Sequence, residues 1–252
     1  MDTSIFRLAS VPASLKIGRE IRRGFLGVLY EGELNGESVT IRKINPLLLQ
    51  GERNTSQLVE QALLMKQLYH PHIVRIVEVF YSKDEGPLLV MERMYDTLET
   101  HLAWHRGKLS HKQQIDICLQ IADAVRYLHS QQPPIVGRNL SPNYVLLSQD
   151  GRTVKLGGCM GFFVNPGPLL YPHQVDPRHY SEKDDIYSLG VVMFRVATQY
   201  SHGEGDLSSL PEDHPLTPII LQCLRDEPGE RSDSATVFRM LSEGETVGQT
   251  IE

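Results

Sequence analysis

The sequence predicts an α+β fold in which a small, strand-rich part with one helix precedes a larger, mainly helical part. Three patterns support this prediction. Apolar and polar residues alternate through residues 15–45, apolar residues recur with helical spacing in 55–68, and the run 185–198 is apolar nearly all round. The character of the sequence changes from strand-like to helical after Met94, so we expect two lobes joined by a short hinge.

Strands are predicted within residues 15–45, where an Asn-Gly pair supplies a tight turn. Successive side chains of a strand point to opposite faces. In the strand that follows this turn, Val39 and Ile41 therefore share one face, while Thr40 and Arg42 share the other. We expect Thr40 and Arg42 to lie on the side that faces the space between the lobes.

A helix is predicted over residues 55–68, with Ser56 as its N-terminal cap. Two more strands are predicted at Val74–Phe80 and Leu88–Met91, separated by a polar turn that contains a glycine. Together with the earlier strands, these elements form the small lobe.

The second half of the chain is predicted to be helical. Ser110 caps a long amphipathic run, and the apolar run 185–198 belongs inside a sizeable core. Two short helices are predicted at residues 219–224 and 234–241. The expected organisation is an N-terminal extension, a small lobe, a large lobe and a flexible tail, at residues 1–14, 15–93, 94–242 and 243–252.

Composition excludes several classes of protein. The net charge of -6 and the pI near 5.9 argue against broad binding to nucleic acid. The three cysteines are far apart and form no metal-ligand pattern, which favours a reducing compartment and a cytoplasmic location. No apolar run reaches the roughly 20 residues that span a membrane, and the first residues lack the pattern of a signal peptide.

Eight segments carry a stronger signal through their order and spacing. They are IRRGFLGVLY, VTIRK, VEQALLMKQLYHPHIV, LLVMER, GRNLSPNYVLL, KLGGCM, YPH and DDIYSLG. Together they resemble the eukaryotic protein kinase domain over about residues 15–242, and most of all its tyrosine-kinase-like group. The resemblance implies a bilobal protein-kinase-like fold, with a small antiparallel β-sheet lobe that carries one helix and a larger, mainly helical lobe. It also implies an ATP-binding cleft.

The groups that would transfer phosphate are replaced. A kinase needs a carboxylate that positions the substrate hydroxyl, and two protein ligands for metal. The resemblance places Asn139 at the carboxylate position, and an amide cannot accept the substrate proton. It places Tyr144 and Gly158 at the metal positions, where the Tyr144 ring would fill the space that an ion needs and Gly158 offers no side-chain oxygen. The lysine of the catalytic loop is replaced by Ser141.

The nucleotide-binding positions are altered less. Arg42 replaces the phosphate-contacting lysine, which keeps the charge but not the shape. The helix glutamate that pairs with this lysine corresponds to Gln61, or to Glu60 if the register slips by one residue, and we expect Arg42 to lie near one of them. If a nucleotide binds, the resemblance implies that it contacts Gly24, Gly27, Leu29, Thr40, Arg42, Met91, Arg93 and Leu146.

The positions that support the fold are kept. Arg138, Asp185 and Arg231 match the family, in which the aspartate fastens the backbone of the catalytic loop. The glutamate that pairs with the buried arginine of the family is replaced by His173. A buried guanidinium needs an anion. We therefore expect a substitute carboxylate for Arg231, with three candidates: Glu182, Asp184 and Glu230.

Three functions follow from this comparison. The leading hypothesis is a pseudokinase, a catalytically inactive domain that requires no cofactor and acts as a scaffold or allosteric partner of other proteins, with an active kinase as one candidate. A second hypothesis is a nucleotide-binding switch that holds ATP without magnesium through Arg22, Arg23 and Arg42. The third is a weakly active serine, threonine or tyrosine protein kinase that recruits Asp150 or Asp176 to the metal.

Overall fold

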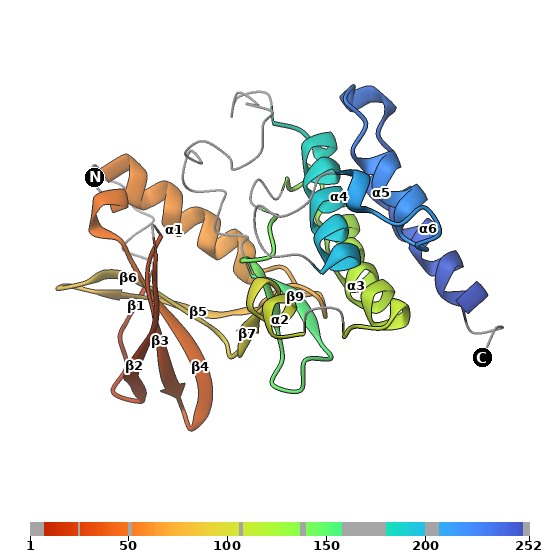
Figure 1. The fold of residues 1–252 in the computed structure, drawn as a ribbon. Helices are drawn as coiled ribbons and strands as arrows, with labels where there is room; N and C mark the ends of the chain where they lie inside the picture. The colour runs from red at the N-terminus through yellow and green to blue at the C-terminus, as the bar shows by residue number, and fades with distance from the viewer. Residues whose placement is uncertain are drawn as a thin grey trace. The chain divides into compact units, whose positions relative to one another are not determined.

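The computed structural model describes residues 8–24, 26–49, 52–105, 108–136, 140–157, 180–199 and 207–248. The chain divides after Met94 into two compact units. The first unit carries the strands of a large sheet and the second carries most of the helices (Figure 1). The two units are described one after the other.

The first unit is built on a six-stranded sheet with the strand order β1-β5-β6-β4-β3-β2. Every neighbouring pair is antiparallel except β1 and β5, which run parallel. The strands span Ala9–Ser10 (β1), Leu15–Gly24 (β2), Gly27–Leu34 (β3), Glu37–Ile44 (β4), Ile76–Ser82 (β5) and Gly86–Glu92 (β6).

The prediction that residues 1–14 form an extension outside the small lobe is partly wrong, because β1 lies within these residues. Ala9 pairs with Phe80 and Ser10 pairs with Tyr81, so this short segment adds an edge strand to the sheet. Val11 packs against the core of the unit. Two residues show too little alternation to be recognised as a strand in a sequence, and their pairing depends on a partner strand about 70 residues away.

The hairpin between β3 and β4 confirms the predicted Asn-Gly turn. Asn35 and Gly36 have φ values of 54° and 89°, as a two-residue turn of this type requires. The resulting register buries Val39 and Ile41 on one face, in a core cluster with residues of β5 and β6. The predicted alternation in β4 is therefore confirmed.

Helix α1 (Glu52–Lys66) accompanies β5 in the first unit, and Lys66 forms an ion pair with Glu78 of β5 at 2.5 Å. The prediction that Ser56 caps this helix is wrong. The helix begins four residues earlier, because residues 52–55 contain no glycine or proline that would stop it. Ser56 is instead buried inside the helix, and its hydroxyl has no hydrogen-bond partner within the described residues.

The second unit combines a small sheet with five helices in its described part. Strands β7 (Asp96–Thr97), β8 (Val145–Leu147) and β9 (Val154–Leu156) are antiparallel neighbours. The helices are α2 (Leu98–Trp104), α3 (His111–His129), α4 (Glu182–Thr198), α5 (Thr217–Cys223) and α6 (Ser234–Gly248). None of the helices in the described ranges is long and apolar enough to cross a membrane.

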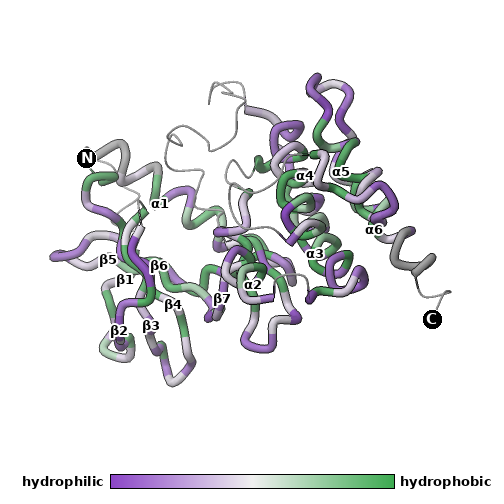
Figure 2. Tube along the Cα trace, viewed as in Figure 1, coloured by the Kyte–Doolittle hydropathy of each residue, from purple (hydrophilic) through white to green (hydrophobic). Residues whose placement is uncertain are grey.

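Helix α4 lies in the core of this unit, in contact with α3 and α5. Its side chains are buried on nearly every side, as the apolar run in the sequence predicts. Figure 2 shows the hydropathy of its residues along the backbone. The predicted cap of α3 is also confirmed, since the Ser110 hydroxyl accepts a bond from the Gln113 N–H and the Gln113 side chain accepts one from the Ser110 N–H.

Two predictions for this unit need correction. Helix α6 continues to Gly248, so residues 243–248 are not part of a flexible tail. This stretch contains no proline, and its two glycines, Gly244 and Gly248, each cost a helix only about 1 kcal/mol. Helix α2 was missed because it has only seven residues, too few for a helical period to stand out.

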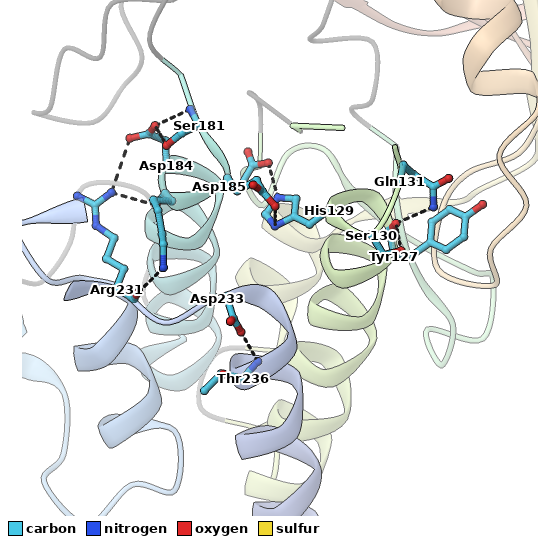
Figure 3. Close-up of polar contacts among 12 residues, drawn as sticks. Tyr127, His129, Ser130, Gln131, Ser181, Asp184, Asp185, Arg231, Asp233 and Thr236 are labelled. Carbon is cyan, nitrogen blue, oxygen red and sulfur yellow. Dashed lines mark hydrogen bonds and ion pairs between the residues drawn. The ribbon is translucent and has the colours of Figure 1, made fainter. Parts of the chain in front are cut away.

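The first turn of α4 carries two carboxylates that connect distant parts of the unit (Figure 3). Asp184 accepts hydrogen bonds from the backbone and the hydroxyl of Ser181, the residue that caps the helix. Asp184 also lies 3.6 Å from the guanidinium of Arg231. The prediction that Arg231 finds a substitute carboxylate is therefore confirmed, and Asp184 is that carboxylate.

Arg231 is almost completely buried, with 4% of its side chain exposed. Its guanidinium donates to three backbone carbonyls, those of Lys183, Arg225 and Asp226, at 2.8–3.1 Å. The ring of Tyr187 lies 4.9 Å from the same group. These contacts satisfy a buried cation without the glutamate that the family uses.

Asp185 binds the end of α3. Its carboxylate lies 2.9 Å from Nε2 of His129 and accepts a hydrogen bond of 3.0 Å from the Tyr180 hydroxyl. Burial raises the pKa of Tyr180, and the adjacent carboxylate raises it further, so the phenol keeps its proton and donates it. The catalytic-loop residues 137–139, which the family fastens to this aspartate, lie outside the described residues.

Replacing Arg231 by alanine should lower the free energy of unfolding by more than about 2 kcal/mol, since a buried carboxylate and three carbonyls lose their partner. Urea denaturation measures this change. The matched control is Lys16→Ala, which removes an exposed ion pair with Glu33 and should change stability by less than about 0.5 kcal/mol. An equally small effect for Arg231→Ala would show that the buried pair does not stabilise the unit.

Candidate functional site

The catalytic-loop segment of the second unit is described from Leu140 onward. The Tyr144 N–H donates a hydrogen bond of 2.9 Å to the Ser141 carbonyl, which closes a turn just before β8 begins. The Pro142 carbonyl accepts a bond of 3.1 Å from the N–H of Glu99 in α2. The segment is therefore held by its own backbone and by α2.

Tyr144 is joined through its backbone to the residue that follows β9. Its carbonyl accepts a hydrogen bond of 2.8 Å from the N–H of Gly157, the residue that precedes Gly158 in the chain. Gly157 has no room for a side chain, because a Cβ atom there would lie 2.5 Å from Leu146. The backbone thus holds Tyr144 beside Gly157, and Tyr144 is half-buried.

The structure describes only some of the other replaced positions. Ser141 is half-buried in the turn that ends the loop. Asn139, Gly158 and His173 lie outside the described residues, so their predicted roles rest on the sequence. The same holds for Asp176, one of the two acids considered as a substitute metal ligand.

Asp150, the other acid considered as a substitute metal ligand, already accepts hydrogen bonds from its neighbours. Its Oδ1 accepts hydrogen bonds from the Ser148 hydroxyl at 2.6 Å and from the Arg152 N–H at 3.1 Å, in the turn between β8 and β9. The bond from Ser148 is the main reason why the pKa of Asp150 is lowered. Within the described ranges, no three His, Cys, Asp or Glu side chains gather where they could hold a metal ion.

An ion pair between Arg195 of α4 and Glu99 of α2 supports the loop. Arg195 of α4 donates from Nη2 to both carboxylate oxygens of Glu99, at 2.9 Å and 3.1 Å. The arginine side chain is 8% exposed. Since the Glu99 backbone also holds Pro142, this pair connects the loop through α2 to the central helix α4. Sequence analysis missed it because residues 99 and 195 are far apart in the chain.

In the first unit, Arg42 lies in β4 opposite Leu29 of β3 and Leu89 of β6. It is half-buried and therefore remains a candidate for contact with phosphate. In α1, Glu60 is exposed, whereas Gln61 is half-buried and its Oε1 is enclosed without a hydrogen-bond partner among the described residues. Gln61 is therefore the residue of α1 that faces the interior. This favours Gln61 over Glu60 as the counterpart of the helix glutamate of the family.

The glycine loop is held against its own sheet. Gly24 and Gly27 face each other at the end of the β2–β3 hairpin, and the Leu26 carbonyl accepts a bond of 3.1 Å from the Asn45 N–H. Gly27 has a φ of 125°, and a Cβ atom there would lie 2.0 Å from the Lys43 carbonyl oxygen. Packing alone therefore requires this glycine, so its presence does not indicate a bound nucleotide.

Two of the candidate cations already have anionic partners. Arg93 donates to Glu31 at 2.9 Å, and Arg19 donates two further bonds to the same carboxylate. The hydrogen bond from Arg19 is the main reason why the pKa of Glu31 is lowered. Arg23 donates two bonds to Glu20. The pair of Arg19 with Glu31 joins the neighbouring strands β2 and β3, and it was missed although opposite charges on neighbouring strands are a signal for such pairs.

The remaining nucleotide-binding candidates are apolar or uncharged. Thr40 and Met91 face each other as register partners in β4 and β6, and both are buried. Leu29 and Leu146 are half-buried, the first in the first unit and the second in β8 of the second unit. The structure therefore brings Thr40 and Met91 together, and it describes Leu146 in a separate unit.

Comparisons with known proteins agree with this architecture. The model of the family described as protein tyrosine and serine/threonine kinase matches residues 15–160. The chain is 28% identical over 235 residues to "Wall-associated receptor kinase-like 21" of Arabidopsis thaliana, covering 81% of the chain and 37% of that protein. It is 30% identical over 191 residues to "Wall-associated receptor kinase-like 14" of the same plant, covering 69% of the chain and 26% of that protein.

A third relative comes from an animal. The chain is 30% identical over 222 residues to "Probable serine/threonine-protein kinase zyg-1" of Caenorhabditis briggsae, covering 81% of the chain and 30% of that protein. The chain thus spans less than two fifths of the length of each of these three relatives. The family match covers more than half of the chain and includes the sheet, the hinge and the catalytic-loop segment. The chain therefore belongs to the protein tyrosine and serine/threonine kinase family.

Proposed function

We propose that this chain is a pseudokinase, a protein-kinase-like domain that does not transfer phosphate and acts through protein partners. The position of Tyr144 carries the proposal. In the sequence, Tyr144 and Gly158 stand at the two positions where the family holds metal, and they supply a phenol and a hydrogen atom. The backbone of Tyr144 is fixed by its bonds to Ser141 and Gly157. Magnesium depends on carboxylate and phosphate oxygens for its protein anchorage.

The catalytic position adds to the same argument. Asn139 replaces the carboxylate that orients the substrate hydroxyl, a role worth roughly 10²–10⁴-fold in rate. Asp150, the one of the two acids considered as substitute metal ligands that the structure describes, is held in a turn by Ser148 and Arg152. A weakly active kinase would have to release this carboxylate before using it as a metal ligand, which makes that alternative less favourable.

One observation favours a second candidate, a switch that binds ATP without magnesium. Arg42 is half-buried at the position of the phosphate-contacting lysine. Against this candidate, Arg23 and Arg93 are already bonded to Glu20 and Glu31. ATP would have to compete with these carboxylates for its counter-charges.

The proposed partners are proteins, with an active kinase as one candidate, and the proposed location is the cytoplasm. The net charge of -6 disfavours nucleic acid as a partner. Cys118 and Cys223 are buried free thiols, and burial raises the pKa of Cys223 to about 12, which keeps this thiol protonated and unreactive. Two inert thiols suit a reducing compartment.

The first prediction concerns nucleotide binding, measured as a thermal shift with millimolar ATP, with and without magnesium. We expect no shift. A ligand present at 100 times its dissociation constant would add about 2.7 kcal/mol, which is roughly 5–10 °C for a domain of this size. A shift that needs magnesium would contradict the pseudokinase proposal. A shift without magnesium that Arg42→Met abolishes would favour the switch instead.

The second prediction concerns phosphate transfer. The single substitution Asn139→Asp should leave incorporation of radiolabelled phosphate into a generic protein substrate at background, because both metal positions remain without ligands and catalytic groups act as a unit. The matched comparison is the triple variant Asn139→Asp, Tyr144→Asn, Gly158→Asp, with folding of each variant checked by circular dichroism. Turnover by the single variant at roughly 1 per second, typical of kinases, would refute the proposal.

A further inference from the structure

The segment 211–216 of the second unit joins a short 3₁₀ turn (Leu207–Ser209) to helix α5 and carries a buried histidine. His214 is 4% exposed. Its ring meets the ring of His111, at the start of α3, edge to face with 4.6 Å between the ring centres. Its Nε2 lies 2.6 Å from the amide oxygen of Gln114, also on α3. The imidazole of His214 therefore holds the segment 211–216 against α3.

The hydrogen bonds around His214 fix its protonation state. The Leu216 N–H donates to Nδ1 at 3.1 Å, so Nδ1 must carry a lone pair. The proton then lies on Nε2, which donates to the oxygen of Gln114. Both ring nitrogens are used, and both are satisfied only when the imidazole is neutral.

The bond to Gln114 is the first link of a longer buried chain of polar groups. The Gln114 amide donates to the Leu109 carbonyl at 3.1 Å. The Gln199 side chain, at the end of α4, donates to the same carbonyl and accepts from the Leu109 N–H. The exposed fractions of Gln114 and Gln199 are 2% and 9%. His214 thus ties the entrance of α5 to α3 and, through Leu109, to α4.

We propose that His214 is a proton-operated latch, which holds the segment 211–216 against α3 when neutral and releases it when a second proton binds to the ring. That proton can bind only at Nδ1. It converts the acceptor of the Leu216 N–H into a donor, so two N–H groups point at each other and the hydrogen bond is lost. The resulting cation is buried beside the ring of His111, without a carboxylate bonded to it among the described residues.

The groups facing His214 make protonation costly in the closed state. On α3, His111 is the titratable neighbour and Gln114 is uncharged; in its own segment, Asp213 is the titratable neighbour. Leu216, at the entrance of α5, and Gln199 of α4 are uncharged. Burial lowers the pKa of His214, His111 lowers it further, and Asp213 opposes the shift in part. The released segment regains the usual pKa near 6.5.

The direction of the pH effect follows from this difference. Between the lowered pKa of the closed state and about 6.5, the open state binds more protons than the closed one. The latch is therefore fully closed above about pH 6.5, and its opening rises by up to tenfold for each unit that the pH falls below this value.

The opening should stay local. The far end of α5 is packed against α4, where a Cβ atom on Gly190 would lie 2.7 Å from the side chain of Cys223. Within the segment, the Thr217 hydroxyl donates to the Pro211 carbonyl at 2.6 Å, and protonation of His214 leaves this bond intact. Mild acid thus loosens the N-terminal end of α5, while its C-terminal end stays packed against α4.

The experiment is hydrogen–deuterium exchange with mass spectrometry on the full chain at pH 7.5 and pH 5.5, with rates corrected for the pH dependence of intrinsic exchange. We expect peptides that cover 210–218 to lose protection at pH 5.5, by up to tenfold in corrected rate for each pH unit below 6.5. Peptides from β3 and β4 of the first unit serve as the internal reference and should keep theirs.

Two variants and a control separate the latch from general acid sensitivity. His214→Asn keeps an acceptor for the Leu216 N–H but cannot titrate, so its exchange over 210–218 should be the same at both pH values. His111→Gln removes a neighbour that lowers the pKa of His214, so opening should begin at a higher pH. His105→Gln removes an exposed histidine and should match the wild type.

The proposal is overturned if the wild type keeps full protection over 210–218 at pH 5.5. It is also overturned if His214→Asn retains the wild-type pH dependence. If His214→Asn fails to fold, the pKa of His214 in the wild-type chain, measured by NMR titration, decides the matter. A value below about 6 supports the latch, and a value at or above 6.5 refutes it. None of these readouts depends on nucleotide or phosphate transfer.

Discussion

Two adjacent carboxylates in the first turn of α4 connect parts of the second unit that lie far apart in the chain. Asp184 holds Arg231 from beyond α5, and Asp185 holds His129 at the end of α3 (Figure 3). All four side chains are buried, so the two carboxylates and the guanidinium must find their partners inside the protein. At the other end of α4, Arg195 holds Glu99 and thereby the loop that ends at Tyr144. The position of the catalytic-loop segment thus depends on ion pairs that take no part in phosphate transfer.

The buried contacts of the second unit are made by residues other than those that the resemblance assigns to phosphate transfer. Arg231 retains a full set of partners although the family's glutamate is replaced by His173, because Asp184 and three carbonyls take over its contacts. Substitution at Tyr144 leaves its backbone bonds to Ser141 and Gly157 in place. These backbone bonds do not depend on the side chain of Tyr144.

The sequence predicted the elements whose pattern is local. The Asn-Gly turn, the alternation of Val39 and Ile41, and the capping box at Ser110 all depend on residues within a few positions of one another, and all are confirmed. Strand β1 and helix α2 were missed because each is too short to show a period. The cap of α1 was misplaced because Ser56 satisfies the local rule, yet the helix starts at Glu52.

For the candidate site, the assignment of Arg42, Gln61 and Tyr144 to positions of the family stays a prediction. Burial favours Gln61 rather than Glu60 as the residue of α1 that faces the interior. The choice of Asp184 over Glu182 or Glu230 could not be made, because helical phase alone leaves several acids near Arg231. The ion pairs of Arg93 with Glu31 and of Arg195 with Glu99 join residues that are 62 and 96 positions apart in the chain. No pattern among neighbouring residues indicates either pair.

The most direct test of the pseudokinase proposal is a single-turnover measurement on the wild-type chain. Enzyme in excess over radiolabelled ATP, with saturating magnesium, reveals any transfer to substrate protein, to the chain itself or to water, without requiring product release. The proposal predicts that the ATP decays at the rate seen in buffer. Decay at roughly 1 per second or faster, abolished by chelating the magnesium, would contradict it.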